Sequence, residues 1–149
     1  MSHPHTPEGY HSVTPSLTVK NAAAALDFYA KAFGAVESYR LPDAKGKIMH
    51  AEFRIGDSTL MLSDEFPEWE ALAPPIGKGG CFRIYVADVD QAYYQAIGVG
   101  ASALREPEDM FWGDRQCSLY DPFGYRWHLA TCVRKMTPAE IREAARQWT

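Results

Sequence analysis

An internal repeat limits the folds open to this chain. An apolar strand-like stretch leads into a helix-like stretch ending in Gly-Ala, and the same order of features returns later in the chain. The offset stays between 66 and 68 positions for the pairs Val19 and Val86, Gly34 and Gly100, and Gly56 and Gly124. A repeated unit has an apolar face to bury, and its copy offers a matching surface. The sequence therefore predicts a paired fold.

Each repeat has the pattern of a strand, a helix and three further strands. Alternating apolar and polar residues mark the strands, while apolar residues three and four positions apart mark the helices. The expected strands are 13–19, 36–41, 48–55, 58–63, 81–86, 102–106, 115–120 and 125–132, and the expected helices follow the cap residues Asn21 and Asp88. We therefore expect an α+β fold of two tandem βαβββ units, about 13–63 and 80–133, in one domain with a linker of residues 64–79.

The two ends of the chain differ from the repeats. Residues 1–12 hold three histidines among polar residues, with too few apolar groups to offset the entropy of ordering, so we expect a mobile tail. Thr137 and Glu140 form a capping box with Pro138 at the first helical position, which predicts a helical tail over 134–149. The apolar stripe of this tail needs a covering surface on its own chain or on a second subunit, and we expect a homodimer.

Charge and composition narrow the partners. The 149 residues carry a net charge of −4 without a basic cluster, so no nucleic-acid partner is expected. No apolar run has the length of a signal peptide core or a membrane span, so we expect no membrane partner and a soluble, cytoplasmic protein. Three widely spaced cysteines fit free thiols in a reducing compartment.

Several phrases inside the repeats resemble the vicinal oxygen chelate superfamily, most of all its glyoxalase and bleomycin-resistance-like members. These phrases are Leu26–Gly34, His50–Gly56, Leu60–Asp64, Phe111–Arg115 and Asp121–Trp127. The resemblance covers residues 13–133 and implies two curved mixed sheets around a cleft. It leaves function open, because that superfamily includes metal-dependent isomerases and lyases, ring-cleaving dioxygenases, epimerases and non-catalytic proteins that sequester drugs.

The resemblance also implies where a metal would bind, namely at inward positions on the first and last strands of each unit. The corresponding residues are Thr14, Met61, Cys81 and His128. This set supplies two good ligands where a site needs three or four, so we expect no metal and no cofactor. His50 and Glu52 share a strand face and form an alternative triad with His128, although such a pair is more often joined by an ordinary hydrogen bond.

The strand faces that point away from the helices are predicted to be polar. Unpaired buried polar groups cost about 1–3 kcal/mol each, so such a face indicates either a ligand cleft or a dense internal network. The ligand-binding residues that we expect are His50, Glu52, Met61, Cys81, Arg83, Tyr85, Trp112, Arg115 and His128.

The aromatic members of this region have two interpretations each. Trp112, with Phe111 and Tyr120 near it, is a stacking wall for a ligand or a core plug between the repeats. Trp69, in the linker, belongs to a lid or partner-contacting segment, or it fills a groove.

Two of the remaining candidates are also ambiguous. In one interpretation, Arg115 and Arg83 bind a carboxylate or phosphonate group of the ligand. In the other, Arg115 forms an ion pair with Asp114 or Asp121. Cys81 is a buried small hydrophobe or a thiol whose pKa is lowered by neighbouring cations.

These residues favour a metal-independent binding protein that holds a small organic ligand in a polar and aromatic cleft. The alternative is a glyoxalase-like lyase or isomerase, in which His128 or His50 is the general base and Arg83 stabilises developing negative charge. The sequence leaves open whether the protein is an enzyme.

Overall fold

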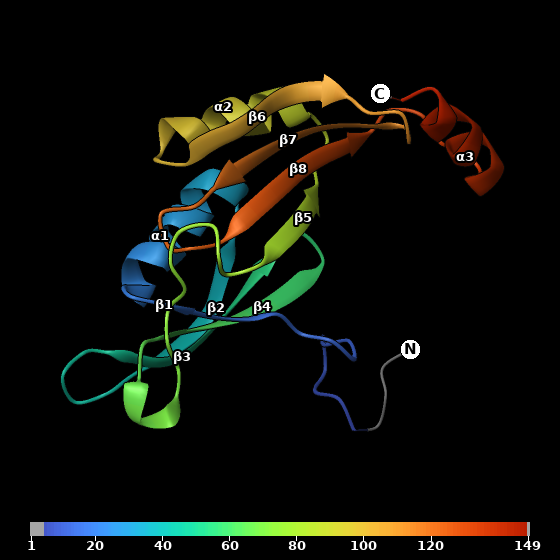
Figure 1. The fold of residues 1–149 in the computed structure, drawn as a ribbon. Coiled ribbons are helices and arrows are strands. Elements are labelled where there is room, and N and C mark those ends of the chain that lie inside the picture. The colour runs from blue at the N-terminus through green and yellow to red at the C-terminus, as the bar shows by residue number, and fades with distance from the viewer. Residues whose placement is uncertain (1–4, 149) are drawn as a thin grey trace. The chain divides into compact units, whose positions relative to one another are not determined.

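The chain forms two compact units that divide between Pro75 and Ile76 (Figure 1). The structure is a computed structural model that describes residues 5–148. Each unit contains a four-stranded mixed sheet.

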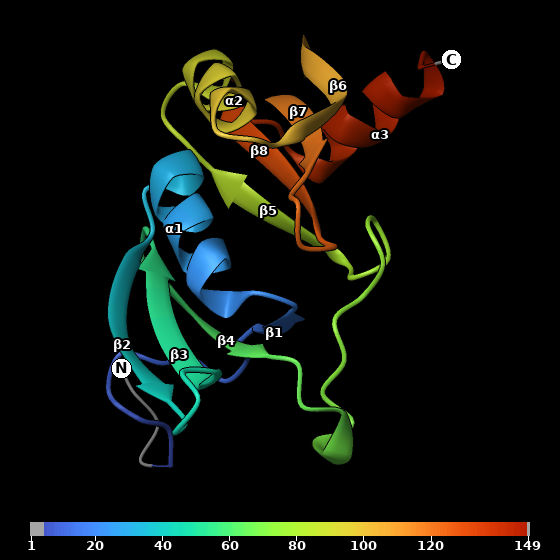
Figure 2. The same ribbon diagram turned by 90° about the vertical axis from the view of Figure 1, so that its left-hand side faces the viewer.

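The first unit follows the predicted order of strand, helix and three strands. Its elements are β1 (Ser16–Val19), α1 (Ala22–Phe33), β2 (Val36–Pro42), β3 (Ile48–Ile55), β4 (Ser58–Asp64) and the short 3-10 helix η1 (Pro67–Trp69). The strand order is β1-β4-β3-β2, with β1 parallel to β4 and the other neighbours antiparallel. Helix α1 lies against one face of this sheet (Figure 2).

Local sequence sets the ends of α1 and its place on the sheet. The Asn21 side chain accepts a hydrogen bond from a first-turn amide at 3.1 Å, as expected of an N-cap. Gly34 ends the helix at a φ of 72°, a left-handed conformation that glycine adopts without steric penalty. The buried Asp64 carboxylate accepts hydrogen bonds from the amides of Ala22 (2.8 Å) and Ile48 (2.7 Å). It thereby joins the end of β4 to the starts of α1 and β3.

The second unit repeats this order and adds the tail helix. Its elements are β5 (Cys81–Tyr85), α2 (Val89–Gly98), β6 (Ser102–Asp109), β7 (Asp114–Tyr120), β8 (Arg126–Cys132) and α3 (Pro138–Arg146). The strand order is β5-β8-β7-β6, and β5 is parallel to β8. Helix α2 contacts β6, β7 and β8 on one face of the sheet. Its Asp88 cap accepts a hydrogen bond from the Gln91 amide at 3.1 Å, and the predicted capping box of α3 is present.

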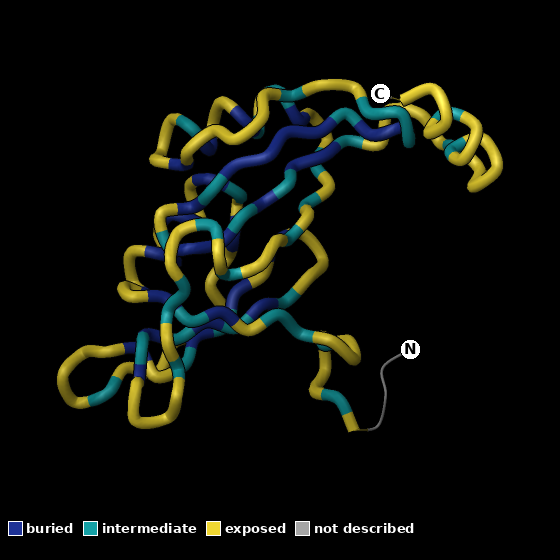
Figure 3. The backbone as a smooth tube through the Cα atoms, in the orientation of Figure 1, coloured by how far each residue is buried: buried dark blue, intermediate teal, exposed yellow. Residues whose placement is uncertain are grey.

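Burial alternates along most of β3, β4 and β8, whereas every residue of β2 is exposed and β7 is buried on both faces over 116–119 (Figure 3). The face that each helix covers carries the apolar core, whose fully buried members include Leu17, Phe53, Leu62, Leu119, Trp127 and Leu129. Aromatic stacking strengthens the first core, where the Tyr29 and Phe53 rings lie 5.6 Å apart. The α+β class with two βαβββ units and a C-terminal helix is therefore confirmed.

Two strand boundaries differ from the prediction by three residues each, for reasons of hydrogen bonding, while the other boundaries differ by one residue at most. β1 begins at Ser16 rather than Val13, because Pro15 has no amide to donate and Val13 is 84% exposed. β6 extends past Pro107 to Asp109, because β6 is an edge strand in which a missing amide is tolerated.

The terminal segments add little to the cores. Gly9 lies beside β4, where the Thr59 hydroxyl donates to its carbonyl oxygen at 3.4 Å. Residues 1–4 of the predicted tail lie outside the described residues, and tail mobility remains a prediction. Within residues 5–148, no helix combines the length and apolar character needed to cross a membrane.

Candidate functional site

One face of the second sheet brings together most of the predicted site residues of its unit. We call the side of this sheet opposite α2 the open face. There Arg83 on β5 lies opposite His128 on β8, which lies opposite Ser118 on β7. Tyr85 is two positions after Arg83 on β5, and Gln116 is two positions before Ser118 on β7. Both share this face, because side chains alternate along a strand.

The buried carboxylate of Asp114 is the centre of this arrangement. Its Oδ2 atom accepts a hydrogen bond from the Tyr85 hydroxyl at 2.9 Å and another from the Trp112 indole nitrogen at 3.0 Å. Nη1 of Arg83 lies 3.7 Å from the same oxygen. The bond to the carboxylate raises the pKa of the Tyr85 phenol, since it favours the protonated donor. Three residues predicted from the sequence thus converge on one carboxylate.

The Arg83 side chain is held in place from two sides. Its Nη1 atom donates to the Gln116 side-chain oxygen at 2.7 Å and faces Asp114. The side chain as a whole is 33% exposed. These two contacts fix the orientation of a planar donor group that suits bidentate binding of an anion.

The surroundings of His128 favour the neutral imidazole. Its Nδ1 atom shares a 2.7 Å hydrogen bond with the hydroxyl of Ser118, which is buried. Partial burial lowers the pKa of His128 below its usual value, and the charges of Arg83 and Arg126 lower it further. A neutral ring held through Nδ1 presents Nε2 for contact with a ligand or for proton transfer.

The interpretation of Cys81 as a buried hydrophobe is wrong. The thiol is exposed because β5 is an edge strand, and Cys81 lies opposite Arg126 on β8. The thiol interacts with the Arg126 guanidinium and raises its pKa. The cysteine that is buried is Cys117, whose pKa burial raises to about 11.

A tight loop positions Trp112 beside Asp114. Gly113 has a φ of 100°, and a Cβ atom at this position would clash with the backbone oxygen of Arg134. The half-buried Trp112 ring contacts Phe111 edge-on at 4.9 Å. The expectation that Tyr120 is near Trp112 is wrong, because Tyr120 is at the other end of β7, about 20 Å along the strand.

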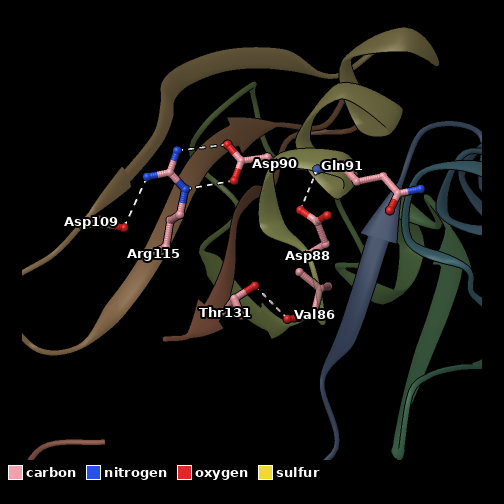
Figure 4. Close-up of polar contacts among 7 residues, drawn as sticks. All are labelled: Val86, Asp88, Asp90, Gln91, Asp109, Arg115 and Thr131. Atoms are coloured by element: carbon pink, nitrogen blue, oxygen red, sulfur yellow. Dashed lines mark hydrogen bonds and ion pairs between the residues drawn. The ribbon is translucent and has the colours of Figure 1, made fainter. Parts of the chain in front are cut away.

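Arg115 lies on the helix side of the sheet, away from the open face (Figure 4). Its guanidinium binds Asp90 at the start of α2 through two hydrogen bonds of 2.8 and 3.0 Å and contacts Asp109 at 3.2 Å. These carboxylates raise the pKa of Arg115. The proposed pairing with Asp114 or Asp121 is therefore wrong. Asp114 lies on the opposite face of β7, and Asp121, beyond the far end of β7, accepts a hydrogen bond from the Trp127 indole nitrogen at 2.8 Å instead. As a ligand-binding residue Arg115 remains a prediction, without support from its neighbours.

The first unit brings a second, smaller group together. The Glu52 carboxylate oxygen Oε2 lies 2.8 Å from Nε2 of His50 and accepts a hydrogen bond from the Tyr39 hydroxyl at 2.7 Å. The Tyr39 and His50 rings lie 5.9 Å apart. Met61 lies opposite Glu52 in the sheet. His50 and Glu52 thus form an ordinary hydrogen-bonded pair, which the sequence favours over a metal triad.

The four positions aligned with metal ligands do not gather as pairs within their units. Met61 lies opposite Ser16 instead of Thr14, and His128 lies opposite Arg83 instead of Cys81. Among residues 5–148, no three His, Cys, Asp or Glu side chains lie close enough to hold a metal ion. The donor set of this region does not fit a divalent cation.

Two further features lie apart from these groups in the first unit. The Trp69 ring is 64% exposed and stacks on the buried Phe66 at 4.8 Å, while Lys47 lies over the Phe66 ring at 4.2 Å. Trp69 thus packs on its own loop.

A pocket of about 210 Å³ lies between α1 and β2, and it includes none of the predicted ligand-binding residues.

Sequence reasoning did not identify Asp114 as the centre of the site. The sequence predicts its neighbour Arg115 instead, because a cation suits an anionic ligand. The alternation of side chains along β7 could have identified Asp114. Asp114 is two and four positions before Gln116 and Ser118, which are predicted to point inward, so it lies on the same face of the strand. Which donors meet at Asp114 depends on β5 and on the loop before β7, whose positions only the fold determines.

Comparisons with known proteins agree with this architecture. The chain is 40% identical over 138 residues to an uncharacterized protein of Mycobacterium bovis, covering 89% of this chain and 91% of that protein. It has the same identity over 138 residues to an uncharacterized protein of Mycobacterium tuberculosis strain H37Rv, covering 89% of this chain and 81% of that protein.

Solved structures share the fold at low sequence identity. TioX from Micromonospora sp. ML1 is 22% identical with a TM-score of 0.67, over 82% of this chain and 98% of TioX. Protein PA1353 from Pseudomonas aeruginosa is 26% identical with a TM-score of 0.65, over 81% of this chain and 97% of that chain. A glyoxalase/bleomycin resistance protein/dioxygenase from Nocardioides is 22% identical with a TM-score of 0.62, over 86% of this chain and 88% of that chain.

The sequence profile of one family matches most of the chain, over residues 9–129. This range includes both sheets almost completely. The chain belongs to the Glyoxalase/Bleomycin resistance protein/Dioxygenase superfamily.

Proposed function

We propose that this protein binds a small organic molecule without a metal ion, on the open face of the second sheet. The observation that carries the proposal is the convergence of Arg83, Tyr85 and Trp112 on the buried Asp114 carboxylate. A network of this kind fixes polar and aromatic groups before a ligand arrives, which lowers the entropy lost on binding.

The orientation of Trp112 supports a stacking role. Its indole N–H is engaged by Asp114, so the ring direction is fixed, and the half-buried ring keeps an accessible surface. Aromatic surfaces beside a few well-placed polar groups are typical of small-molecule sites. Arg83 and His128 supply the polar groups here.

Tryptophan fluorescence tests this proposal. Binding of a small aromatic compound is expected to quench the emission of the wild type in a saturable way, and Trp112→Phe is expected to remove most of the change. Trp69→Phe is the matched control, because Trp69 is exposed in the other unit and its replacement is expected to leave the quenching intact.

Two results would refute the proposal. One is the absence of saturable binding by calorimetry for neutral, anionic and cationic aromatic compounds alike. The other is quenching that Trp69→Phe removes and Trp112→Phe leaves unchanged.

One observation favours a second candidate function, an isomerase or lyase of the glyoxalase-like group. His128 combines a lowered pKa, a fixed Nδ1 and the nearby Arg83, which suits a general base beside a group that stabilises negative charge. An enzyme would convert its bound compound, and His128→Gln would abolish turnover while leaving binding largely intact. Binding without conversion in both proteins would support the binding function alone.

A further inference from the structure

The open face of the second sheet carries two arginines around one neutral histidine. Arg83 lies directly opposite His128 on the neighbouring strand. Arg126 is two positions before His128 on β8, about 7 Å along the strand and on the same face. The Arg83 guanidinium is held on the Gln116 and Asp114 side of His128, and Arg126 lies beside Cys81 on the other side. A small group above the imidazole therefore lies between the two cations.

We propose that the ligand of this face is a small organic carboxylate, whose carboxylate group binds Arg83 and Arg126 above His128. This inference rests on the proposed function and names the class of ligand. It does not involve Asp114 directly, which orients Arg83 and Trp112 instead.

The donors of Arg83 match a carboxylate. Gln116 and Asp114 face Nη1, while Nε and Nη2 have no hydrogen-bond partner among residues 5–148. An arginine with one nitrogen anchored and an adjacent pair of donors accessible presents a planar fork to an incoming carboxylate.

The local charge also favours an anion. Asp114 balances one arginine, and within residues 5–148 no carboxylate forms an ion pair with Arg126. Both arginines lower the pKa of His128, which indicates that their positive field reaches the imidazole. Arg105 and Glu108 on β6 share this face and pair with each other at 3.8 Å. Arg83, Arg126 and Asp114 together therefore leave one positive charge on this face, although the whole chain carries −4. A monoanion would neutralise it.

The first sheet provides the contrast. Its corresponding polar group consists of Glu52 with His50 and Tyr39, so a carboxylate already occupies the centre of that face. Arg54 on β3 is an exposed arginine of the same unit and lies outside this group. Arg54→Gln therefore removes the same charge from the first unit and leaves every residue named in the proposed site in place.

Benzoate and benzamide, which have nearly the same shape and differ in charge, test the inference. We expect saturable binding of benzoate to the full chain in amide chemical-shift titrations, with shifts on β5 and β8. Benzamide is expected to bind about tenfold more weakly, because a charge-assisted pair with arginine contributes more than a neutral hydrogen bond. Phenylphosphonate is the third probe and separates carboxylate from phosphonate recognition.

Variants assign the effect to residues. Arg83→Gln and Arg126→Gln are each expected to weaken benzoate binding about tenfold, and Arg83→Lys to weaken it because a point charge replaces the fork. Arg54→Gln is expected to change it less than about twofold. Thermal unfolding of each variant verifies that it is folded, and Arg126→Gln is informative even if Arg83→Gln is unstable.

The outcomes separate this inference from the proposed function. Equal affinity for benzoate and benzamide, or tighter binding of phenylphosphonate, would overturn the carboxylate assignment and leave small-molecule binding in place. Benzoate binding that Arg54→Gln weakens as much as Arg126→Gln would also overturn it. If none of the probes, charged or neutral, binds to the open face, both proposals fail.

Discussion

At the scale of single residues, the candidate site depends on polar groups that satisfy one another. Asp114 is buried and receives two donors and a nearby cation on one oxygen. Removing such a group leaves its partners unpaired, which is more costly than losing one exposed contact.

We predict that Asp114→Ala lowers the free energy of unfolding by about 2 kcal/mol, because Tyr85 and Trp112 lose their acceptor and Arg83 its counter-charge. Urea unfolding measures this change. The control Asp109→Ala removes a carboxylate that is 73% exposed and is expected to have an effect below about 0.5 kcal/mol. Equal effects of the two variants would contradict the central role of Asp114.

His128 predicts a pH dependence of stability. Its pKa is lowered in the folded protein, mainly by burial and additionally by the charges of Arg83 and Arg126. The Ser118 hydroxyl shares a hydrogen bond with its Nδ1 atom. As the pH falls, His128 therefore becomes protonated in the unfolded chain before it does so in the folded protein. The stability that the neutral His128 contributes above about pH 6.5 is lost as the pH falls toward the lower pKa of the folded state. Melting temperatures between pH 7.5 and about pH 5 should fall more for the wild type than for His128→Gln. Parallel curves would refute the shift.

At the scale of elements, similar caps stabilise helices that are buried to different degrees. Asn21 caps α1, whose inner face is buried, while Thr137 caps α3, in which no residue is buried. Helix stability in proteins comes mostly from packing. Loss of the cap should therefore affect the stability of the whole protein at α1 but only the local stability of the helix at α3.

We expect Asn21→Ala to lower the global free energy of unfolding by about 1 kcal/mol. Thr137→Ala should leave the melting temperature within about 1 °C of the wild type and instead speed hydrogen exchange of the α3 amides, because α3 opens locally. Comparison of melting curves with exchange rates for both variants checks this. A large drop in melting temperature for Thr137→Ala would show that α3 is part of a cooperative core.

The elements also show where sequence patterns fail. The alternation of β3 and β4 and the caps of α1 and α2 were predicted well, because these signals are local and the core lies on one side of the sheet. β1 and β6 were misjudged at their ends, because a strand extends only as far as its neighbour offers partners. For the same reason, nothing in its own sequence marks Cys81 as an edge residue.

At the scale of the whole molecule, we predict that the protein needs no metal ion, because its candidate ligand residues supply too few suitable donors. Extensive dialysis against a chelator should leave the melting temperature and the ligand-induced quenching unchanged, since the described residues offer no three-ligand group. Elemental analysis of protein purified without a histidine tag is the direct measurement. Near-stoichiometric zinc, nickel, iron or manganese that is lost in His128→Gln would contradict the prediction and favour the enzyme.

The homodimer is likewise still a prediction, as is the cytoplasmic location. The tail helix offers some physical support, because Trp148 is 49% exposed while its ring contacts Phe111 at 5.3 Å. Sedimentation velocity should give twice the 16.7 kDa of one chain, and a mass of one chain at micromolar concentration would refute the dimer.

The repeat, the βαβββ order, the helix caps and the polar face of each sheet follow from local sequence, because each depends on residues close together in the chain. That Arg83, Tyr85 and Trp112 meet at Asp114, while Arg115 lies on the opposite side with Asp90, follows only from the fold. Those partners come from different strands and loops, and strand register and loop path fix which of them touch.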